Sequence, residues 1–282
     1  MKVLITGGSG WIGRATTERL RVEGHEPLSF DRSGGLDVTV RDDVYESVAD
    51  VDHVIHLAGL LGTHELLDQA ERAFEVNVLG SLHVTTACVK YGVGLTQITM
   101  PRVNPSLYAA TKACAMDTSE AYRHSGDLRV SYVRAYNAYG PGQAYGGDHP
   151  QKIVPSFSTA GWLGEPLSIW GSGSLHVDLV HVDDVARVLV AAMKFGDGQV
   201  FDAGTGYVQD VLSVARDIIQ ITGGRSRIQH LPRRKGERTR STEKDVAHGQ
   251  GWDLLHGWHP VFDHDRFVEA VKSYRPPYTV AV

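Results

Sequence analysis

A tyrosine and a lysine near the middle of the chain are the residues best suited to acid–base chemistry. Tyr108 and Lys112 stand four positions apart, in a run that predicts the start of a helix with both side chains on one face. An isolated tyrosine has a pKa of about 10 and is a weak base at neutral pH. A lysine ammonium beside it favours the phenolate and is expected to lower that pKa. The pair therefore predicts a base that takes a proton from a substrate hydroxyl.

A third group is needed to orient the substrate, and the segment before the tyrosine contains two candidate hydroxyls. Residues 95–99 read as a strand that ends at Thr99, nine positions before Tyr108. Ser106 lies in the short polar loop that follows, so the catalytic hydroxyl is either of the two, with Thr99 preferred. Residues 94–107 contain no Asp or Glu, so this segment provides no additional acid–base pair.

The first thirteen residues predict a site for a pyrophosphate. Residues 3–5 form a short apolar strand, glycines follow at positions 7, 10 and 13, and residues 14–23 have helix-like spacing. Gly7 allows a sharp turn, Gly10 lets the backbone approach the phosphates, and Gly13 permits close packing of the helix. The helix N-terminus, with Trp11 and Ile12, presents unpaired N–H groups to the phosphates. The spacing indicates a dinucleotide as cofactor.

The type of dinucleotide depends on the end of the second expected strand, residues 27–30. Asp31 follows it at the distance at which a carboxylate accepts hydrogen bonds from the adenosine ribose and repels a 2′-phosphate. We therefore expect NAD, with some tolerance of NADP because Arg32 is adjacent. The cationic nicotinamide ring would also favour the Tyr108 phenolate. Further contacts with the cofactor are expected from later parts of the chain, at Asp37, Val38, Leu57, Ala58, Gly59 and Asn77.

Strands alternating with helices must position these residues. A short third strand is expected over residues 36–38, with Asp37 near the adenine edge, and a fourth over 51–59. A helical pattern follows over 65–91, with a break near Gly80, and we expect Asn77 to bond backbone within it. His53 and His56 fall on opposite faces of their strand and make a poor metal pair, so no metal site is expected. The alternation predicts an α/β protein with a doubly wound parallel sheet.

Composition limits the class of protein. The chain has 282 residues, 42% of them hydrophobic, which is enough for a large core. A net charge of −5 favours neither nucleic acid nor an anionic membrane as partner. The two cysteines fall in helix-like runs, and no apolar run is long enough to span a bilayer. We expect a soluble protein of a reducing compartment, the cytoplasm.

Several further segments carry a family resemblance. Together with the glycine turn, Asp31 and the Tyr108–Lys112 pair, they resemble those of extended short-chain dehydrogenase/reductases of the nucleotide-sugar epimerase and dehydratase type. The match covers essentially the whole chain, and its remaining segments are residues 134–142, 169–173, 181–185, 234–237 and 251–252. The resemblance implies a Rossmann-type sheet with a smaller, interleaved C-terminal substrate lobe. It places the NAD-binding domain at 1–140, with 175–205 returning to it, and the lobe at 141–174 and 206–282.

The resemblance also implies site residues and an assembly. Asn137 matches an asparagine that contacts substrate, and Arg234 matches an arginine that holds the diphosphate of a nucleoside-diphosphate sugar. A second diphosphate arginine is missing, because its place is occupied by Val177. Apolar or small residues on more than one face of residues 79–91 and 108–124 predict a homodimer, consistent with the four-helix interface that the resemblance implies.

These features favour NAD-dependent epimerisation of a nucleoside-diphosphate sugar, at C4 through a transient 4-keto intermediate. Two alternatives remain in other reaction classes: a nucleotide-sugar oxidoreductase that releases its product, and a dehydratase. The short segment before Tyr108 and the missing arginine leave a non-catalytic, cofactor-binding paralogue as a further alternative. Glu65 and Asp148 are carboxylates that could reach the site from elsewhere in the chain and support a dehydratase.

Overall fold

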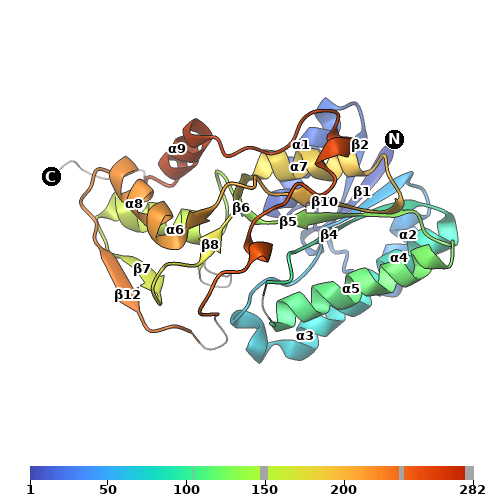
Figure 1. The fold of residues 1–282 in the computed structure, drawn as a ribbon. Helices are drawn as coiled ribbons and strands as arrows, with labels where there is room; N and C mark the ends of the chain where they lie inside the picture. The colour runs from blue at the N-terminus through green and yellow to red at the C-terminus, as the bar shows by residue number, and fades with distance from the viewer. Residues whose placement is uncertain (104, 147–151, 235–237, 277–282) are drawn as a thin grey trace.

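The larger part of the molecule is built around a six-stranded sheet, in which every pair of neighbouring strands is parallel (Figure 1). The computed structural model describes residues 1–276 except residue 104 and the segments 147–151 and 235–237. In spatial order the strands are β10 (Asp197–Ala203), β5 (Val130–Ala135), β4 (Gly94–Thr99), β3 (His53–His56), β1 (Lys2–Thr6) and β2 (Glu26–Phe30). The order reverses at β1, as in a doubly wound fold.

Alternate side chains of the strands divide the core into two layers. Val3 and Ile5 of β1 pack in one hydrophobic cluster, whereas Leu4 between them packs in the other. The first layer lies under α1 (Trp11–Val22) and α7 (Val182–Ala192), and the second lies under α2 (Arg41–Val48), α4 (Gly80–Tyr91) and α5 (Leu107–His124) (Figure 1). β1 is therefore buried on both faces, as the apolar run at residues 3–5 requires.

The expected strand at residues 36–38 is not formed. The carboxylate of Asp37 instead accepts hydrogen bonds from the backbone N–H and the hydroxyl of Thr39, both at 2.9 Å. These local hydrogen bonds favour a turn at residues 37–39 over an extended strand. Val38 is buried all the same, against Gly80 at the start of α4.

The expected helix over residues 65–91 is divided into several pieces. A 3₁₀ turn (Glu65–Asp68) leads into α3 (Ala70–Phe74), a π-helical turn (Glu75–Leu79) and then α4. The break near Gly80 is confirmed, and its form is a π-turn with Asn77 at its centre. A π-turn widens the helix by one residue and often marks a functional position.

The remaining elements pack around a third cluster, which lies to the left in Figure 1. They include α6 (Ile153–Leu163), α8 (Val211–Ile221), α9 (His264–Ser273) and the parallel pair β7 (Leu167–Trp170) and β12 (Ile228–Leu231). Two short pairs complete them: β6 (Asn137–Tyr139) with β9 (Leu179–His181), and β8 (His176–Val177) with β11 (Gln209–Asp210). The division into two domains at the stated boundaries stays a prediction. Among the described residues, no helix is long and apolar enough to span a membrane.

Candidate active site

The glycine turn between β1 and α1 is closed by its own backbone. Gly7 has a left-handed φ of 74°, and the Gly10 N–H donates to the Gly7 carbonyl at 3.0 Å. A Cβ on Gly13 would lie 2.2 Å from that same carbonyl oxygen, so only glycine fits there. Only Gly7 atoms lie within 4 Å of a Cβ built on Gly10, the residue that caps α1. This turn fits a pyrophosphate at the helix N-terminus.

The two residues after Gly10 are anchored in different ways. The indole N–H of Trp11 donates to the Pro141 carbonyl at 2.8 Å, which ties the start of α1 to the loop after β6. Ile12 packs against the core layer that includes α7. Their backbone N–H groups stay at the first turn of α1, where anions are favoured.

Asp31 lies at the carboxyl end of β2, beside the glycine turn. One of its carboxylate oxygens accepts a hydrogen bond from the Ser33 N–H at 3.1 Å. The Ser33 hydroxyl donates to the Ser9 hydroxyl at 3.0 Å, so this loop is attached to the glycine turn. Arg32 is exposed next to Asp31. Ser9 and Ser33 belong to the candidate ribose site, and the sequence pattern alone did not identify them.

Asp37 has a second partner besides Thr39. Its other carboxylate oxygen accepts a hydrogen bond from the Arg72 guanidinium at 3.2 Å. Burial on its own raises the pKa of Asp37, but the hydrogen bonds from Thr39 and the charge of Arg72 outweigh it and hold that pKa below its ordinary value. Asp37 is therefore an ionised acceptor at the edge of the loop, and contact with adenine stays a prediction.

The end of β3 brings the chain close to the glycine turn. The Leu57 N–H donates to the Thr6 carbonyl at 3.0 Å, and the Ala58 N–H donates to the Thr6 hydroxyl at 3.2 Å. A Cβ on Gly7 would lie 3.0 Å from the Ala58 nitrogen, so the two loops are in contact. Both loops lie at the carboxyl edge of a parallel sheet where the strand order reverses, which is the usual place for a ligand.

Asn77 fixes the loop that follows β3. Its amide oxygen accepts from the Leu60 N–H at 2.7 Å, and its amide nitrogen donates to the Leu60 carbonyl at 3.0 Å and to the Thr111 hydroxyl at 3.0 Å. The prediction that Asn77 bonds backbone is confirmed. Because Thr111 belongs to α5, the same side chain also sets the distance between that helix and the loop at Gly59.

Lys112 reaches this loop from α5. Its side chain is almost fully buried, and its ammonium nitrogen lies 3.3 Å from the position that a Cβ on Gly59 would occupy. Tyr108 is half-buried one turn earlier, in the first turn of the same helix. Helical spacing places the two side chains on one face, as predicted. The structure thus brings together the glycine turn, the end of β3 and the pair on α5.

Burial controls the charges of this pair. It lowers the pKa of Lys112 to about 8 and raises the pKa of Tyr108 to about 12. Without the cofactor, burial therefore shifts the pKa of Tyr108 in the direction opposite to the one needed for a base. A lowered pKa in the presence of Lys112 and the cationic nicotinamide ring stays a prediction, and a sequence pattern carries no measure of desolvation.

The two candidate hydroxyls occupy different positions. Thr99 is buried at the carboxyl end of β4, the strand next to β3. Ser106 is the N-cap of α5, and its hydroxyl accepts a hydrogen bond from the Ala109 N–H at 3.1 Å. Capping gives Ser106 a structural reason to be there, which leaves Thr99 as the better candidate for the catalytic hydroxyl.

The candidate substrate residues lie on the smaller cluster and its border. Asn137 begins β6 with its side chain exposed, and the Arg234 guanidinium lies 4.4 Å from the centre of the Trp170 ring, at the end of β7. Val177 is buried, so its position could not present a phosphate ligand to solvent. Residues 235–237 of the Arg234 motif, and Asp148, lie outside the described residues.

A buried chain of hydrogen bonds supports the site from behind. His56 of β3 bonds the Thr6 hydroxyl at 2.6 Å through Nδ1 and the Ser81 hydroxyl at 2.8 Å through Nε2. Ser81 in turn donates to the Asn77 carbonyl at 2.7 Å. Burial, with a smaller effect of the Lys112 charge, lowers the pKa of His56 to about 3, so the ring is neutral. Among the described residues, no group of three His, Cys, Asp or Glu side chains could hold a metal ion.

The fold and the site together define a class of protein. The sheet is doubly wound and parallel, a glycine turn lies at a helix N-terminus, a carboxylate follows β2, and Lys112 lies against the end of β3 one turn after Tyr108. This is the arrangement of a dinucleotide-dependent enzyme that moves a proton and a hydride.

Comparison with known proteins agrees with this class. The model of the NAD dependent epimerase/dehydratase family matches residues 3–100 and 95–204. The chain is 30% identical to UDP-glucose 4-epimerase of Mycolicibacterium smegmatis, over 92% of this chain and 94% of that one. It is 25% identical to UDP-N-acetyl-alpha-D-glucosaminuronate decarboxylase of Bacillus cytotoxicus, over 82% and 83% of the two chains. The chain belongs to the NAD dependent epimerase/dehydratase family.

A solved structure shows the same fold with its cofactor. UDP-glucose 4-epimerase of Thermus thermophilus, in complex with NAD, superposes with a TM-score of 0.84 at 26% identity, over 99% of this chain and all of that one. The glycine turn, Asp31 and Lys112 of the present chain fit NAD, the cofactor of the family. The predicted family, the Rossmann-type fold and NAD are thereby confirmed.

Proposed function

We propose that this protein catalyses the NAD-dependent epimerisation of a nucleoside-diphosphate sugar at C4, through a transient 4-keto sugar. The observation that carries the proposal is the position of Lys112. Its ammonium lies against Gly59 at the end of β3, and the same helix places Tyr108 one turn earlier. The relatives that act as UDP-glucose 4-epimerases support this choice of reaction.

Tyr108, Thr99 and Lys112 each have one task in this reaction. Tyr108 accepts the proton of the C4 hydroxyl and returns it after the sugar has turned its other face to the cofactor. Thr99 donates a hydrogen bond to the same oxygen, and Lys112 holds the nicotinamide ribose. Bound NAD would supply the hydride acceptor and donor for C4, and its positive charge would favour the Tyr108 phenolate. Atoms and electrons balance, because the proton and the hydride both return to the sugar.

Binding of the substrate is assigned to the smaller cluster. Asn137 contacts the sugar, and Arg234 binds the diphosphate, for which a planar guanidinium is well suited. The Trp170 ring under Arg234 holds the guanidinium in one orientation. This single arginine replaces the pair that the family pattern leads one to expect.

Dehydration requires an additional acid and base near C5 and C6. The segment from β4 to α5 contains no carboxylate. Of the two carboxylates named for this role, Glu65 lies within the described residues. Its charge acts on Lys152, whose pKa is lowered by burial and partly restored by Glu65. Glu65 is thus engaged electrostatically with Lys152. Epimerisation is therefore the simpler reaction for these side chains.

An isotope experiment distinguishes the reactions. Purified protein is incubated with UDP-, GDP- and dTDP-sugars that carry deuterium at C4, and the products are followed by NMR. We expect the label to stay at C4 of the epimer, with no solvent hydrogen entering C5. A deoxy-keto product or solvent label at C5 would instead identify a dehydratase or a C5 epimerase. Tyr108→Phe is the matched variant, and it should lose turnover by orders of magnitude while still binding NAD.

We further propose a cytoplasmic homodimer that forms through α4 and α5. On α5, Ala110, Cys114 and Ala121 are exposed along one side and are small enough to let a second helix approach, while Asp117 between them is paired with Arg102. At the edge of α4, Leu79 and Tyr91 are exposed to 42% and 37%. Cys88 and Cys114 are both free thiols, which suits a reducing compartment.

A further inference from the structure

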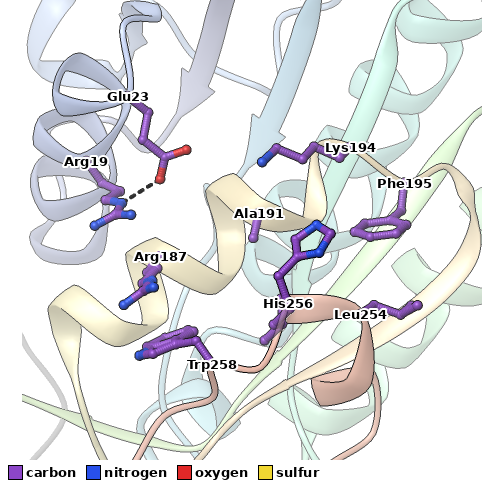
Figure 2. A pocket seen from close by; sticks show the side chains of 10 residues that line it. Arg19, Glu23, Arg187, Ala191, Lys194, Phe195, Leu254, His256 and Trp258 are labelled. Carbon is purple, nitrogen blue, oxygen red and sulfur yellow. Dashed lines mark hydrogen bonds and ion pairs between the residues drawn. The ribbon is translucent and has the colours of Figure 1, made fainter.

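A cavity of about 260 Å³ lies on the face of the sheet opposite α5. It is bounded by α1, by α7 and by the segment 254–258, as Figure 2 shows. None of the residues assigned above to cofactor, substrate or catalysis lines it. The cavity is therefore separate from the candidate active site, although α1 borders both.

Three cations and one carboxylate line this cavity. Arg19 is paired with Glu23 at 2.6 Å. In the described part of the chain, no carboxylate lies within 4 Å of the Arg187 guanidinium or the Lys194 ammonium. Two positive charges thus remain without a counter-ion at contact distance, in a hollow that is partly closed to water.

Arg187 is held in place by an aromatic ring. Its guanidinium carbon lies 3.8 Å from the centre of the Trp258 ring. Burial and the nearby charge of Arg19 lower the pKa of Arg187, and the more distant carboxylates of Asp184 and Glu23 offset this only in part. Keeping two guanidinium groups near each other therefore costs the fold free energy, and an anion between them would remove that cost.

The helix dipole does not explain this arrangement. Arg19 lies in the last turn of α1 and Lys194 lies just beyond α7, where cations are favoured by the C-terminal carbonyls. Arg187 is in the middle of α7, too far from its end to gain from the dipole. Stacking on Trp258 accounts for its orientation, but not for the gathering of three cations around one hollow.

The backbone at His256 supplies a second, independent observation. Among the described residues, His256 alone combines a side chain with a left-handed φ, of 56°. Such conformations are costly for residues other than glycine and gather at ligand sites. His256 is one of the residues that line the cavity (Figure 2).

We propose that this α1–α7 cavity binds the phosphoryl dianion of a small molecule. A guanidinium fork binds two phosphate oxygens at once, and a lysine ammonium adds a point charge. Trp258 and Phe195 form an apolar wall that accepts a small organic group. The volume is below the range of about 300–1,000 Å³ that drug-sized ligands occupy, so a whole dinucleotide or nucleotide sugar does not fit.

Calorimetric titration of the NAD-saturated Arg234→Gln protein tests this proposal, because NAD occupies one of the other phosphate sites and the substitution removes the guanidinium proposed for the second. Inorganic phosphate and phenyl phosphate are the two probes. Arg187→Gln and, separately, Lys194→Gln should each weaken binding about tenfold or more. Arg21→Gln is the matched control: it removes the same charge from the exposed side of α1 and should leave affinity within about twofold.

Glu23→Gln provides a test in the opposite direction. Its carboxylate competes with the ligand for Arg19, so its removal should tighten binding of both probes, which a purely structural role would not produce. Tighter binding of phenyl phosphate than of phosphate identifies an organic phosphate as the ligand, whereas equal affinity identifies free phosphate. Lack of binding at about 10 mM, or unchanged affinity in both the Arg187 and Lys194 variants, overturns the proposal.

Discussion

A lysine that is almost completely buried must cost the folded protein free energy whenever it is charged. The pKa of Lys112 is about 8 in the folded chain, against an ordinary 10.5. Between these values the unfolded chain binds more protons, so the wild-type protein gains stability as the pH rises from 8 to 10.5. Below pH 8 the full penalty, about 3 kcal/mol, applies.

Lys112→Met should therefore be more stable than the wild type at pH 7, by up to about 3 kcal/mol. The difference should shrink toward pH 10.5, and turnover should be lost at every pH. Urea unfolding at pH 7 and pH 10 measures this, with the exposed Lys90→Met as control. A variant that is less stable than the wild type at pH 7 would show that Lys112 contributes packing that outweighs its charge.

Removal of the Ser106 hydroxyl should reduce stability, whereas removal of the Thr99 hydroxyl should reduce turnover. Ser106→Ala should destabilise the protein by about 1 kcal/mol, the usual cost of losing a cap, and should leave turnover nearly unchanged. Thr99→Val should reduce turnover by about a hundredfold with little change in unfolding. Measuring kcat and urea unfolding on both variants separates the roles. The opposite pattern would assign catalysis to Ser106.

Asp31 should set the preference for NAD. A carboxylate that meets the ribose hydroxyls should favour NAD over NADP by about 1–3 kcal/mol. In Asp31→Ala the repulsion of the 2′-phosphate is gone and the adjacent Arg32 can attract it, so the two cofactors should bind with more nearly equal affinity. Fluorescence titration with both cofactors measures the ratio. Tighter binding of NADP by the wild type would refute the assignment.

Residues with a fixed spacing in the chain could be predicted from the sequence. The glycine turn, Asp31 and the Tyr108–Lys112 pair are of this kind, because local geometry alone brings each group together. The Thr6–His56–Ser81 hydrogen bonds could not be predicted, since they join three elements that only the folded sheet brings into contact. The direction in which the pKa of Tyr108 shifts could not be predicted either, because it depends on burial in the folded protein.

At the scale of the element, α5 has two faces with different uses. One face carries Tyr108 and Lys112 toward β3, and the other exposes a row of small residues that includes Cys114. In the proposed dimer, Cys114→Arg should introduce a charge and bulk in the middle of the helix interface and give a monomer. Sedimentation at micromolar concentration measures this. Gln220→Arg on the exposed side of α8 is the matched control and should stay dimeric; a wild-type monomer would contradict the proposal.

The positions of most helices and strands followed from their periodicity, but two features did not. Residues 36–38 have the composition of a strand, and the Asp37 carboxylate instead ties the chain into a turn. The π-turn around Asn77 arises because that side chain bonds Leu60 and Thr111 at once. In both places a polar side chain overrides local propensity, and its partners are absent from any short window of sequence.

At the scale of the whole molecule, a buried carboxylate joins distant segments. Asp178 is fully buried, and it accepts hydrogen bonds from the N–H groups of Thr205, Gly206 and Ala247 and from the Thr205 hydroxyl. Its negative charge is thus stabilised by backbone donors from two parts of the chain that follow β10. The chain at the junction between β8 and β9 is held to the loops after β10 through this one side chain.

Asp178→Asn should cost about 3 kcal/mol of stability. The amide keeps one acceptor oxygen but turns the other position into a donor that faces backbone N–H groups. Thermal or urea unfolding measures the change. Asp253→Asn, at an exposed position, is the control and should shift stability by less than about 0.5 kcal/mol. An equal effect of both substitutions would show that Asp178 does not stabilise the contact between these distant segments.

The place of β10 in the large sheet has a consequence for how the protein is made. This strand pairs with β5 at the sheet edge, yet it is separated from β5 in sequence by β6, α6 and β7 of the smaller cluster. A nascent chain of about 140 residues already contains the glycine turn and the Tyr108–Lys112 pair. In that chain β5 is an open edge of the sheet, and α7 is not yet present to cover one face. Nascent chains of that length expose a strand able to pair with other chains. The cofactor-binding half can close only after the translating ribosome has passed Ala203.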